Sequence, residues 1–206
     1  MINVNSKAGN IITIILAAGS SKRMGAVKQL LPWGGSTLIG HAIEQSLNSD
    51  ANEVYVVLGA HYEQIKKKID NYPVAIIKNE GWESGMGTSI SVAVNYILNK
   101  HKPLNGLLIT LSDQPLIDYS HLNVLIKTFR ENQFNLITAV QYGAKKGVPA
   151  VFPKAYFKHL LKLGQDFGAR DLLNASTPIL SVNLGQNILD LDTEEEYQEA
   201  YSKYHF

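Results

Sequence analysis

Residues 11–33 read IITIILAAGSSKRMGAVKQLLPW. The opening run, Ile11–Ala17, is apolar and rich in β-branched residues, which predicts a buried strand. The strand leads into the small residues Ala17, Ala18 and Gly19, which let a ligand approach the backbone closely. In open α/β sheets, ligands bind beyond the carboxyl ends of the strands. This stretch therefore indicates an α/β fold with a ligand site directly after the first strand.

Strand-like and helix-like segments alternate along the rest of the chain. The hydrophobic patterns predict strands over 53–59, 73–77 and 106–111 and helices over 37–47, 62–69, 86–97 and 122–129. Later segments predict two strands over 135–142 and 148–152 joined by a turn over 143–147, two short helices, strands over 178–183 and 188–192, and a polar helix from Thr193. This order favours a mainly parallel sheet with right-handed crossovers and a small antiparallel insertion.

The bulk composition excludes several classes of function. Of the 206 residues, 45% are apolar, and the formal net charge of +1 is too small for nonspecific attraction to nucleic acid or an anionic membrane. The absence of cysteine excludes disulfides, thiolate metal sites and a cysteine nucleophile, and fits a reducing cytoplasm. No apolar run approaches the roughly 18 residues of a membrane span. We expect a frayed tail over residues 1–10 and a single domain over 11–206.

The loop after the first strand carries the groups of a triphosphate site. Exposed N–H groups in a turn of small residues form an anion-binding concavity, and Ser20 and Ser21 add hydroxyl donors. Arg23 can grip phosphate oxygens with two parallel hydrogen bonds, and Lys28 adds a point charge. The loop has neither the Walker A spacing nor G-x-G-x-x-G. The alternative is a glycine-rich surface turn flanked by solvated cations.

The whole string from Leu16 to Trp33 resembles the motif LAAGxSxRMGxxKxLLP of a nucleotidyltransferase family. That family contains the molybdenum-cofactor cytidylyltransferases and guanylyltransferases. The resemblance implies a Rossmann-like three-layer α/β/α domain, the nucleotide-diphospho-sugar transferase fold, in which this loop holds the NTP phosphates. It also implies catalytic roles for Arg23 and Lys28. The nucleotide-binding residues that it implies in this loop are Leu16, Ala17, Ala18, Gly19, Ser20, Ser21, Arg23 and Lys28.

A bound triphosphate leads us to expect a divalent cation, Mg²⁺ or Mn²⁺. Mg²⁺ prefers one or two carboxylates together with phosphate oxygens and water. Asp113 is a candidate ligand because it follows an apolar strand and precedes Gln114-Pro115 in a rigid turn. The alternative is that Asp113 only caps that turn. Residues 112–115 resemble the family's metal-binding D-x-P element, which implies that Asp113 is a catalytic metal ligand.

A second carboxylate is expected from the far end of the chain. Residues 188–194 resemble the family's D-I-D-T-P-E-D motif, without its proline. In a strand, Asp190 and Asp192 would point to the same face. We favour Asp190 as the metal ligand and keep Asp192 as second choice, because Asp192 could instead be the N-cap of the last helix, with Glu195 three residues on.

Two further segments concern the nucleobase and the acceptor. Gly85 and Gly87 open a predicted helix, where N–H donors and the helix dipole favour anions, although the stretch could be only a flexible turn. In the resembled family, the equivalent stretch with Ser89 lies against the nucleobase and sugar. Residues 164–170, GQDFGAR, resemble the G-D-x-G-A-R element of the cytidylyltransferase branch with one inserted glutamine. The resemblance implies acceptor contacts from Gln114, Asp166 and Arg170, whereas Arg170 could also be a solvated helix cation.

Taken together, the resemblance implies a magnesium-dependent transferase. It would carry CMP from CTP to the phosphate of molybdopterin with release of pyrophosphate, in the cytoplasm, and a molybdoenzyme would receive the product. No nucleic acid or membrane partner is expected. The alternatives are GMP transfer to the same acceptor, a sugar-phosphate or polyol-phosphate nucleotidyltransferase, an NAD(P)-dependent oxidoreductase on the same scaffold, and a non-catalytic nucleotide-binding regulator.

Overall fold

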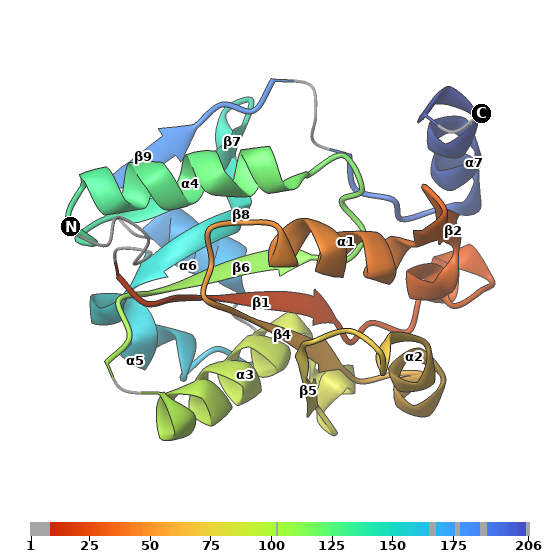
Figure 1. The fold of residues 1–206 in the computed structure, drawn as a ribbon, viewed down its shortest axis with the longest axis horizontal. Helices are drawn as coiled ribbons and strands as arrows, with labels where there is room; N and C mark the ends of the chain where they lie inside the picture. Colours follow the sequence, from red (N-terminus) through yellow and green to blue (C-terminus); the bar gives the residue numbers. More distant parts are fainter. Residues whose placement is uncertain (1–8, 102, 165–167, 176–177, 186–188, 205–206) are drawn as a thin grey trace, which may run out of the picture.

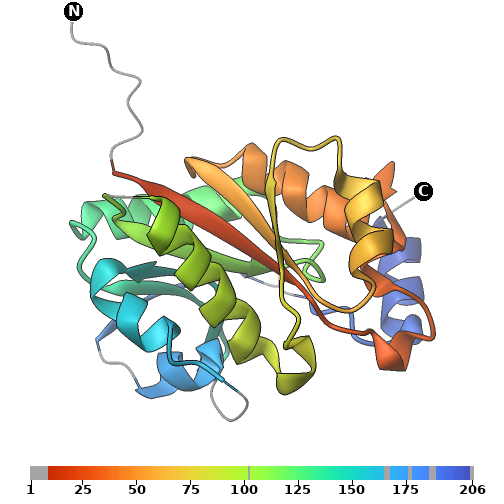
Figure 2. The same ribbon diagram turned by 90° about the horizontal axis from the view of Figure 1, so that it is seen from below.

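A seven-stranded sheet forms the centre of the molecule and is covered by helices on both faces (Figures 1 and 2). The computed structural model describes residues 9–101, 103–164, 168–175, 178–185 and 189–204. The strand order is β5-β4-β1-β6-β8-β7-β9, and within this sheet only β8 runs antiparallel to its neighbours. The predicted three-layer α/β/α fold with a mostly parallel sheet is confirmed.

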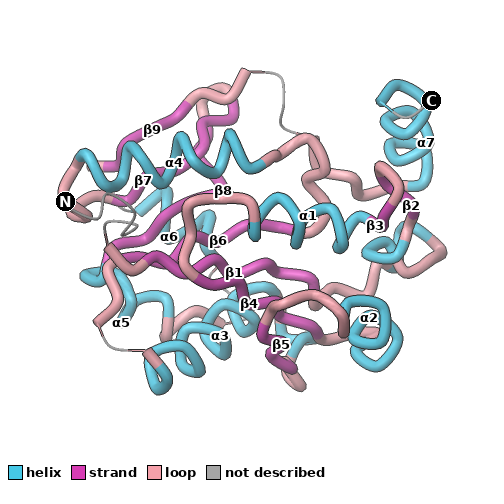
Figure 3. Tube along the Cα trace, in the orientation of Figure 1, coloured by secondary structure: helices cyan, strands magenta, loops and turns pink. Residues whose placement is uncertain are grey.

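The elements follow the predicted order, and Figure 3 shows their distribution. The strands of the main sheet are β1 (Ile11–Ala17), β4 (Glu53–Leu58), β5 (Ala75–Lys78), β6 (Gly106–Leu111), β7 (Ile137–Tyr142), β8 (Lys145–Pro153) and β9 (Ile179–Val182). The α-helices are α1 (Leu38–Leu47), α2 (Tyr62–Ile69), α3 (Met86–Lys100), α4 (Tyr119–Glu131), α5 (Phe157–Leu160), α6 (Ala169–Ala175) and α7 (Glu194–Tyr204). Short elements are the 3-10 helices η1 (Lys22–Met24), η2 (Lys28–Leu30), η3 (Trp82–Ser84) and η4 (Lys154–Tyr156), and the two-stranded ribbon of β2 (Pro32–Trp33) and β3 (Ser36–Thr37).

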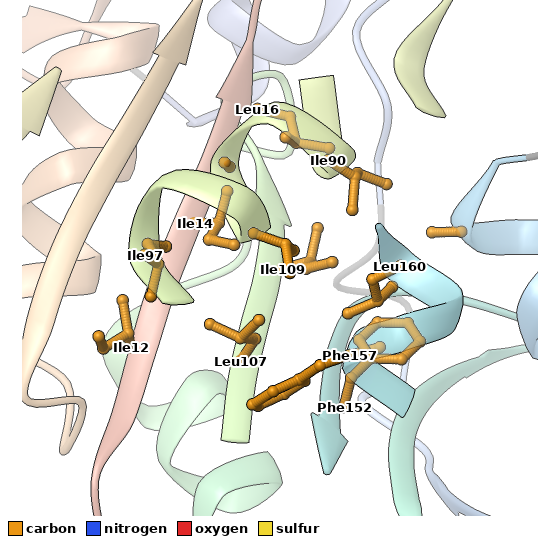
Figure 4. Packing of buried hydrophobic residues seen from close by; sticks show 14 of the residues in the cluster. Ile12, Ile14, Leu16, Ile90, Ile97, Leu107, Ile109, Phe152, Phe157 and Leu160 are labelled. Carbon is orange, nitrogen blue, oxygen red and sulfur yellow. The ribbon is translucent and has the colours of Figure 1, made fainter. Parts of the chain in front are cut away.

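Strand β1 shows why this sheet forms. Successive side chains of a strand point to opposite faces, and every residue of β1 is buried. Ile12, Ile14 and Leu16 pack toward α3, α5 and α6, in the cluster of Figure 4. Ile15 and Ala17 pack toward α1 and α2 on the other face. Because burial of such an apolar side chain contributes about 1.5–3 kcal/mol, a strand with apolar side chains on both faces is stable only between two layers of helices.

The predicted antiparallel insertion lies inside the main sheet. Strand β8 lies between β6 and β7 inside the main sheet, where Ala150, Val151 and Phe152 are fully buried. The turn between β7 and β8 is shorter than the predicted 143–147, because pairing resumes at Lys145 after Gly143 turns with a φ of 58°. The hairpin is therefore part of the core and not an appendage.

The structure differs from the sequence-based prediction near both ends of the described chain. Asn10, which we expected in a frayed tail, donates its N–H to Asn105 Oδ1 at 2.8 Å, while residues 1–8 lie outside the described residues. The strand predicted over 188–192 is wrong for the described part, 189–192, which has no neighbouring strand. One backbone hydrogen bond anchors that segment, from Leu191 N–H to Asp113 O at 3.0 Å.

The start of the last helix also differs from the prediction. Thr193 Oγ1 accepts the Glu196 N–H at 3.2 Å, and Glu196 Oε2 accepts the Thr193 N–H at 2.9 Å. These two bonds form a capping box in which Thr193 is the N-cap. The pairing of Asp192 with Glu195 that we considered is therefore wrong, and the Asp192 carboxylate is available for other contacts. Among the described helices, none has the length and apolar character needed to cross a membrane.

Candidate functional site

The loops that follow the four parallel strands β1, β4, β5 and β6 meet at the carboxyl end of these strands, at the right in Figure 1. Backbone hydrogen bonds join them: Ala60 N–H donates to Ala18 O at 3.0 Å, Asn79 N–H donates to Leu58 O at 2.8 Å, and Ser112 N–H donates to Leu16 O at 3.3 Å. This is the position at which an open α/β sheet binds its ligands.

A buried glutamine supports the glycine loop from behind. The side chain of Gln29, only 3% exposed, donates to Ala17 O at 3.3 Å and to Gly19 O at 2.9 Å. Ser21 Oγ donates to Gln29 Oε1 at 3.2 Å, and Ser21 itself has a φ of 54°. The amide of Gln29 thereby fixes the backbone path of the loop. The sequence analysis missed this residue, since nothing in the motif distinguishes a buried glutamine from an exposed one.

Lys28 lies at the centre of the charged groups. Its Nζ donates to Asp113 Oδ2 at 2.6 Å, to Leu191 O at 2.8 Å and to Asp192 Oδ1 at 3.2 Å. The Lys28 side chain is 12% exposed and that of Asp113 is 21% exposed. Burial raises the pKa of the Asp113 carboxyl, and this effect outweighs the nearby Lys28 ammonium, which lowers that pKa.

Asp192 joins the predicted arginine to the predicted lysine. Arg23 donates to Asp192 Oδ2 at 3.0 Å, while the other carboxylate oxygen accepts from Lys28. Partial burial raises the pKa of Asp192, but the hydrogen bond and charge of Lys28 and the charge of Arg23 outweigh it, so the pKa is lowered. The structure thus brings together Arg23, Lys28, Asp113 and Asp192 from three distant segments.

Asp190 points to a different group. Gln114 Nε2 donates to Asp190 Oδ1 at 2.8 Å, to Tyr142 OH at 2.9 Å and to Val148 O at 3.3 Å. Burial raises the pKa of Tyr142, and the charge of Asp190 raises it further. Gln114 is 5% exposed, and its Oε1 has no hydrogen-bond partner among the described residues. Asp190 and Asp192 therefore contact different partners, unlike the shared strand face that we expected.

A cavity of about 720 Å³ opens at this edge of the sheet. It is lined by Leu16, Ala17, Ala18, Gly19, Ser20, Ser21, Lys22, Arg23, Met24, Lys28, Gln29, Trp82, Glu83, Gly85, Met86, Ser89, Leu111, Ser112, Asp113 and Asp192. Nearly all of the predicted nucleotide-binding residues lie on this wall. Gly87 is the exception, since it is buried inside the first turn of α3.

Two residues predicted for the acceptor, Gln114 and Arg170, do not line this cavity. Gln114 is buried beside it, and Arg170 is exposed on α6, close enough for its charge to lower the pKa of Tyr142. Asp166 lies outside the described residues.

Two carboxylates on the cavity wall offer oxygens to Mg²⁺ or Mn²⁺. Asp113 offers Oδ1, a buried oxygen that has no hydrogen-bond partner among the described residues, and Asp192 offers a carboxylate on the cavity wall. The described part of the chain holds no group of three or more His, Cys, Asp or Glu side chains arranged for a metal. Mg²⁺ is commonly held by one or two carboxylates plus substrate phosphates, and Asp113 and Asp192 fit that mode.

A family model described as the MobA-like NTP transferase domain matches residues 13–179. The chain belongs to this family. Family membership confirms the resemblance drawn from the loop motif, and makes the protein a nucleotidyltransferase.

The proteins to which this chain is similar have different names. The Nicotine blue oxidoreductase of Paenarthrobacter nicotinovorans is 33% identical over 59% of this chain and 58% of that protein. The Purine catabolism protein PucB of Bacillus subtilis is 27% identical over 91% of this chain and 94% of that protein. The Molybdenum cofactor cytidylyltransferase of Escherichia coli is 24% identical over 93% of this chain and 95% of that protein. The crystal structure of Rv0371c from Mycobacterium tuberculosis has a TM-score of 0.78 at 25% identity, covering 94% of this chain and 98% of that one.

Proposed function

We propose that the protein transfers CMP from CTP to the phosphate of a molybdopterin-type acceptor, with Mg²⁺ or Mn²⁺, in the cytoplasm. The observation that carries the proposal is the convergence of Arg23, Lys28, Asp113 and Asp192 beside a glycine loop in one cavity. The choice of CTP and pterin is supported by the similarity to the E. coli molybdenum cofactor cytidylyltransferase over 93% of the chain. A molybdoenzyme would then receive the product.

The reaction is an in-line displacement at the α-phosphorus of the NTP. An acceptor phosphate oxygen forms the new P–O bond, the bond from the α-phosphorus to the bridging oxygen breaks, and pyrophosphate leaves with the electron pair. The nucleophile is already an anion, so no strong general base is needed. The protein must instead hold two anions in line and neutralise the charge of the transition state.

Arg23, Lys28 and the amides of the glycine loop suit that task. Arg23 is 69% exposed, so its guanidinium can reach a phosphate without leaving a buried position. The Lys28 ammonium lies in the same cavity wall and can exchange a carboxylate for phosphate oxygens. Preorganised donors of this kind each contribute about 10²–10³ in rate.

Asp113 and Asp192 are the proposed metal-holding residues. A divalent cation held there would screen the charge of the α-phosphate and act as a Lewis acid. Asp192 is favoured over Asp190, our first choice from the sequence, because Asp192 lines the cavity and Asp190 accepts from Gln114. A solved structure with a TM-score of 0.75 is described as the M. tuberculosis Rv0371C complex with manganese, which supports testing Mn²⁺ beside Mg²⁺.

Gln114, Arg170 and Asp166 remain our proposed acceptor contacts. The Gln114 amide is oriented by two groups that can only accept, Asp190 Oδ1 and Val148 O, so its Oε1 is left to accept an N–H or O–H. Arg170 offers a guanidinium on the exposed side of α6 for the acceptor's phosphate.

The test is a metal-dependent pyrophosphate-release assay. CTP and GTP are each offered with molybdenum-loaded pterin, a hexose 1-phosphate or a polyol phosphate. We expect release with CTP and the pterin, dependent on Mg²⁺ or Mn²⁺ and lost in Asp113→Asn. Release with GTP, or with a sugar or polyol phosphate, would replace the proposed substrates. No release from any pair would overturn the function and favour a non-catalytic nucleotide-binding regulator.

One relative favours testing a second activity. The 33% identity over 59% of this chain to a protein named Nicotine blue oxidoreductase favours testing the NAD(P)-dependent oxidoreductase that the sequence left as an alternative. The first loop lacks the G-x-G-x-x-G pattern of dinucleotide-binding folds. The test offers NADH or NADPH together with a quinonoid dye as electron acceptor and measures the absorbance of the reduced cofactor. Oxidation of the cofactor would establish this alternative.

A further inference from the structure

Trp82 is the only aromatic residue among the described residues that line the 720 Å³ cavity. It begins η3, directly before Gly85 and the start of α3, and none of the roles assigned so far involves it. Met86, which lines the same cavity one turn later, is 50% exposed. Trp82 and Met86 thus contribute an indole and a thioether to a cavity that is also lined by the cations and the glycine loop.

The position of Trp82 depends on a glycine in a neighbouring loop. A Cβ added at Gly59 would lie 2.4 Å from Trp82 Cβ and 2.8 Å from Ala18 O. Trp82 therefore packs directly against the backbone that follows β4, and this backbone is also bonded to the glycine loop through Ala60 N–H and Ala18 O. The base of the Trp82 side chain therefore lies against a backbone segment that is bonded to the proposed phosphate-binding loop.

A buried asparagine fixes the segment that carries Trp82. Asn79, 2% exposed, donates to Ser89 Oγ at 2.9 Å and to Thr88 Oγ1 at 3.0 Å, and its Oδ1 accepts the Gly81 N–H at 3.0 Å. These bonds join the end of β5 to the first turn of α3 and enclose η3 between them. Because the side chain is preorganised, little conformational entropy is lost when a ligand packs on it.

We propose that Trp82 is the platform on which a planar heteroaromatic ring of a substrate stacks. The inference rests on the proposed function, in which both substrates carry such a ring: the nucleobase of the NTP and the pterin of the acceptor. Stacking of a base on an aromatic side chain is tolerant of base identity, and its loss weakens binding by about 5- to 150-fold. Met86 adds a polarisable contact at the ring's edge.

Intrinsic fluorescence tests the contact with the tryptophan intact. The chain has two tryptophans, and Trp33 is 3% exposed within a hydrophobic cluster, so Trp82→Phe leaves a buried reference. Wild type and Trp82→Phe are titrated with CTP, GTP, neopterin and inorganic tripolyphosphate. We expect saturable quenching by the ring-bearing ligand in wild type only, and none by tripolyphosphate, which has the charge without the ring.

Calorimetric dissociation constants complete the test. Trp82→Ala is expected to weaken binding of either the nucleotide or neopterin by about 5- to 150-fold, to leave tripolyphosphate binding unchanged, and to be largely rescued in Trp82→Phe. The ligand that weakens identifies whether nucleobase or pterin is the stacked ring. Tyr119→Ala, at a 48% exposed tyrosine outside the cavity, is the matched control.

Unchanged affinities for both ring-bearing ligands in Trp82→Ala would overturn the inference, whatever the wild-type activity. Failure of the proposed function gives a different result, since wild type would release no pyrophosphate while the Trp82-dependent quenching persisted.

Discussion

The Lys28 ammonium lies 2.6 Å from Asp113 Oδ2 and 3.2 Å from Asp192 Oδ1, so one cation serves two carboxylates that come from distant parts of the chain. A divalent cation that binds these carboxylates must compete with Lys28. A triphosphate that attracts Lys28 would release them. The geometry therefore couples nucleotide binding to metal binding through one side chain.

Lys28→Met should raise the affinity for Mn²⁺ in the absence of nucleotide by about tenfold or more, because the two carboxylates lose their internal counter-ion. Electron paramagnetic resonance of free Mn²⁺ measures this directly. Pyrophosphate release should fall by about 10²–10³ in the same variant. Lys127→Met, at an exposed lysine of α4, is the control. Equal or weaker Mn²⁺ binding in Lys28→Met would contradict the coupling.

Arg23 should matter for rate and hardly at all for stability. Its ion pair with Asp192 joins side chains that are 69% and 40% exposed, and such pairs contribute less than about 1 kcal/mol to folding. Arg23→Ala should therefore unfold at nearly the wild-type urea concentration while transfer slows by about 10²–10³. Arg23→Lys keeps the charge but loses the forked donor geometry, so we expect only partial recovery. A large drop in stability without a rate effect would refute this assignment.

Gln29 should matter for both stability and nucleotide affinity. Gln29→Leu removes the bond to the buried Ala17 O, at a cost of about 1–3 kcal/mol in the free energy of unfolding, and the bond to the more exposed Gly19 O. The loop loses its support, so nucleotide affinity should fall as well. Urea denaturation and calorimetry give the two quantities. Gln198→Leu, at an exposed glutamine of α7, should change neither, and a stable Gln29→Leu with normal affinity would be incompatible with this role.

Asp118 predicts a pH dependence of stability. Its Oδ1 accepts the His121 N–H at 3.0 Å and the Ser120 hydroxyl at 2.6 Å at the N-cap of α4. Burial raises the pKa of Asp118, but these hydrogen bonds outweigh it and the folded-state pKa is lowered. A lowered pKa stabilises the fold at pH values above the unfolded value of about 3.9, and this contribution is lost as the pH falls through the folded-state pKa.

Asp118→Ala should accordingly cost about 0.5–2 kcal/mol at neutral pH, and the difference from wild type should shrink below about pH 4. Asp118→Asn keeps an acceptor and should cost less. Denaturation curves at neutral and acidic pH provide the comparison, and an equal loss at both would show that the cap's charge contributes nothing.

Most of the fold was predictable because its strands are buried on both faces. Ile11–Ala17 and Gly106–Leu111 are recognisable as runs that are apolar except for one threonine each, and the structure places both at the predicted bounds. Their carboxyl ends must meet at one edge in a parallel sheet, so the approach of Lys28 to Asp113 also follows from the sequence.

The remaining parts depend on contacts that a local pattern does not carry. Choosing between Asp190 and Asp192 required the hydrogen bond from Leu191 to Asp113 O, which fixes the register of an isolated segment. The supporting roles of Gln29 and Asn79 required knowledge of burial, because both residue types are more often exposed. The signal that could have indicated Trp82 was an aromatic residue three positions before Gly85, at a glycine-rich helix start.

The hydrogen bonds that join Leu191 to Asp113 and Lys28 have a consequence for biosynthesis. Leu191 gives its N–H to Asp113 and its carbonyl to Lys28, and the next residue supplies a carboxylate. While this segment is still inside the ribosomal exit tunnel, a nascent chain can pair β1, β4, β5 and β6 and form the glycine loop, but it lacks the carboxylate of Asp192. Under the proposed function, such an unfinished chain would bind nucleotide before it could transfer any.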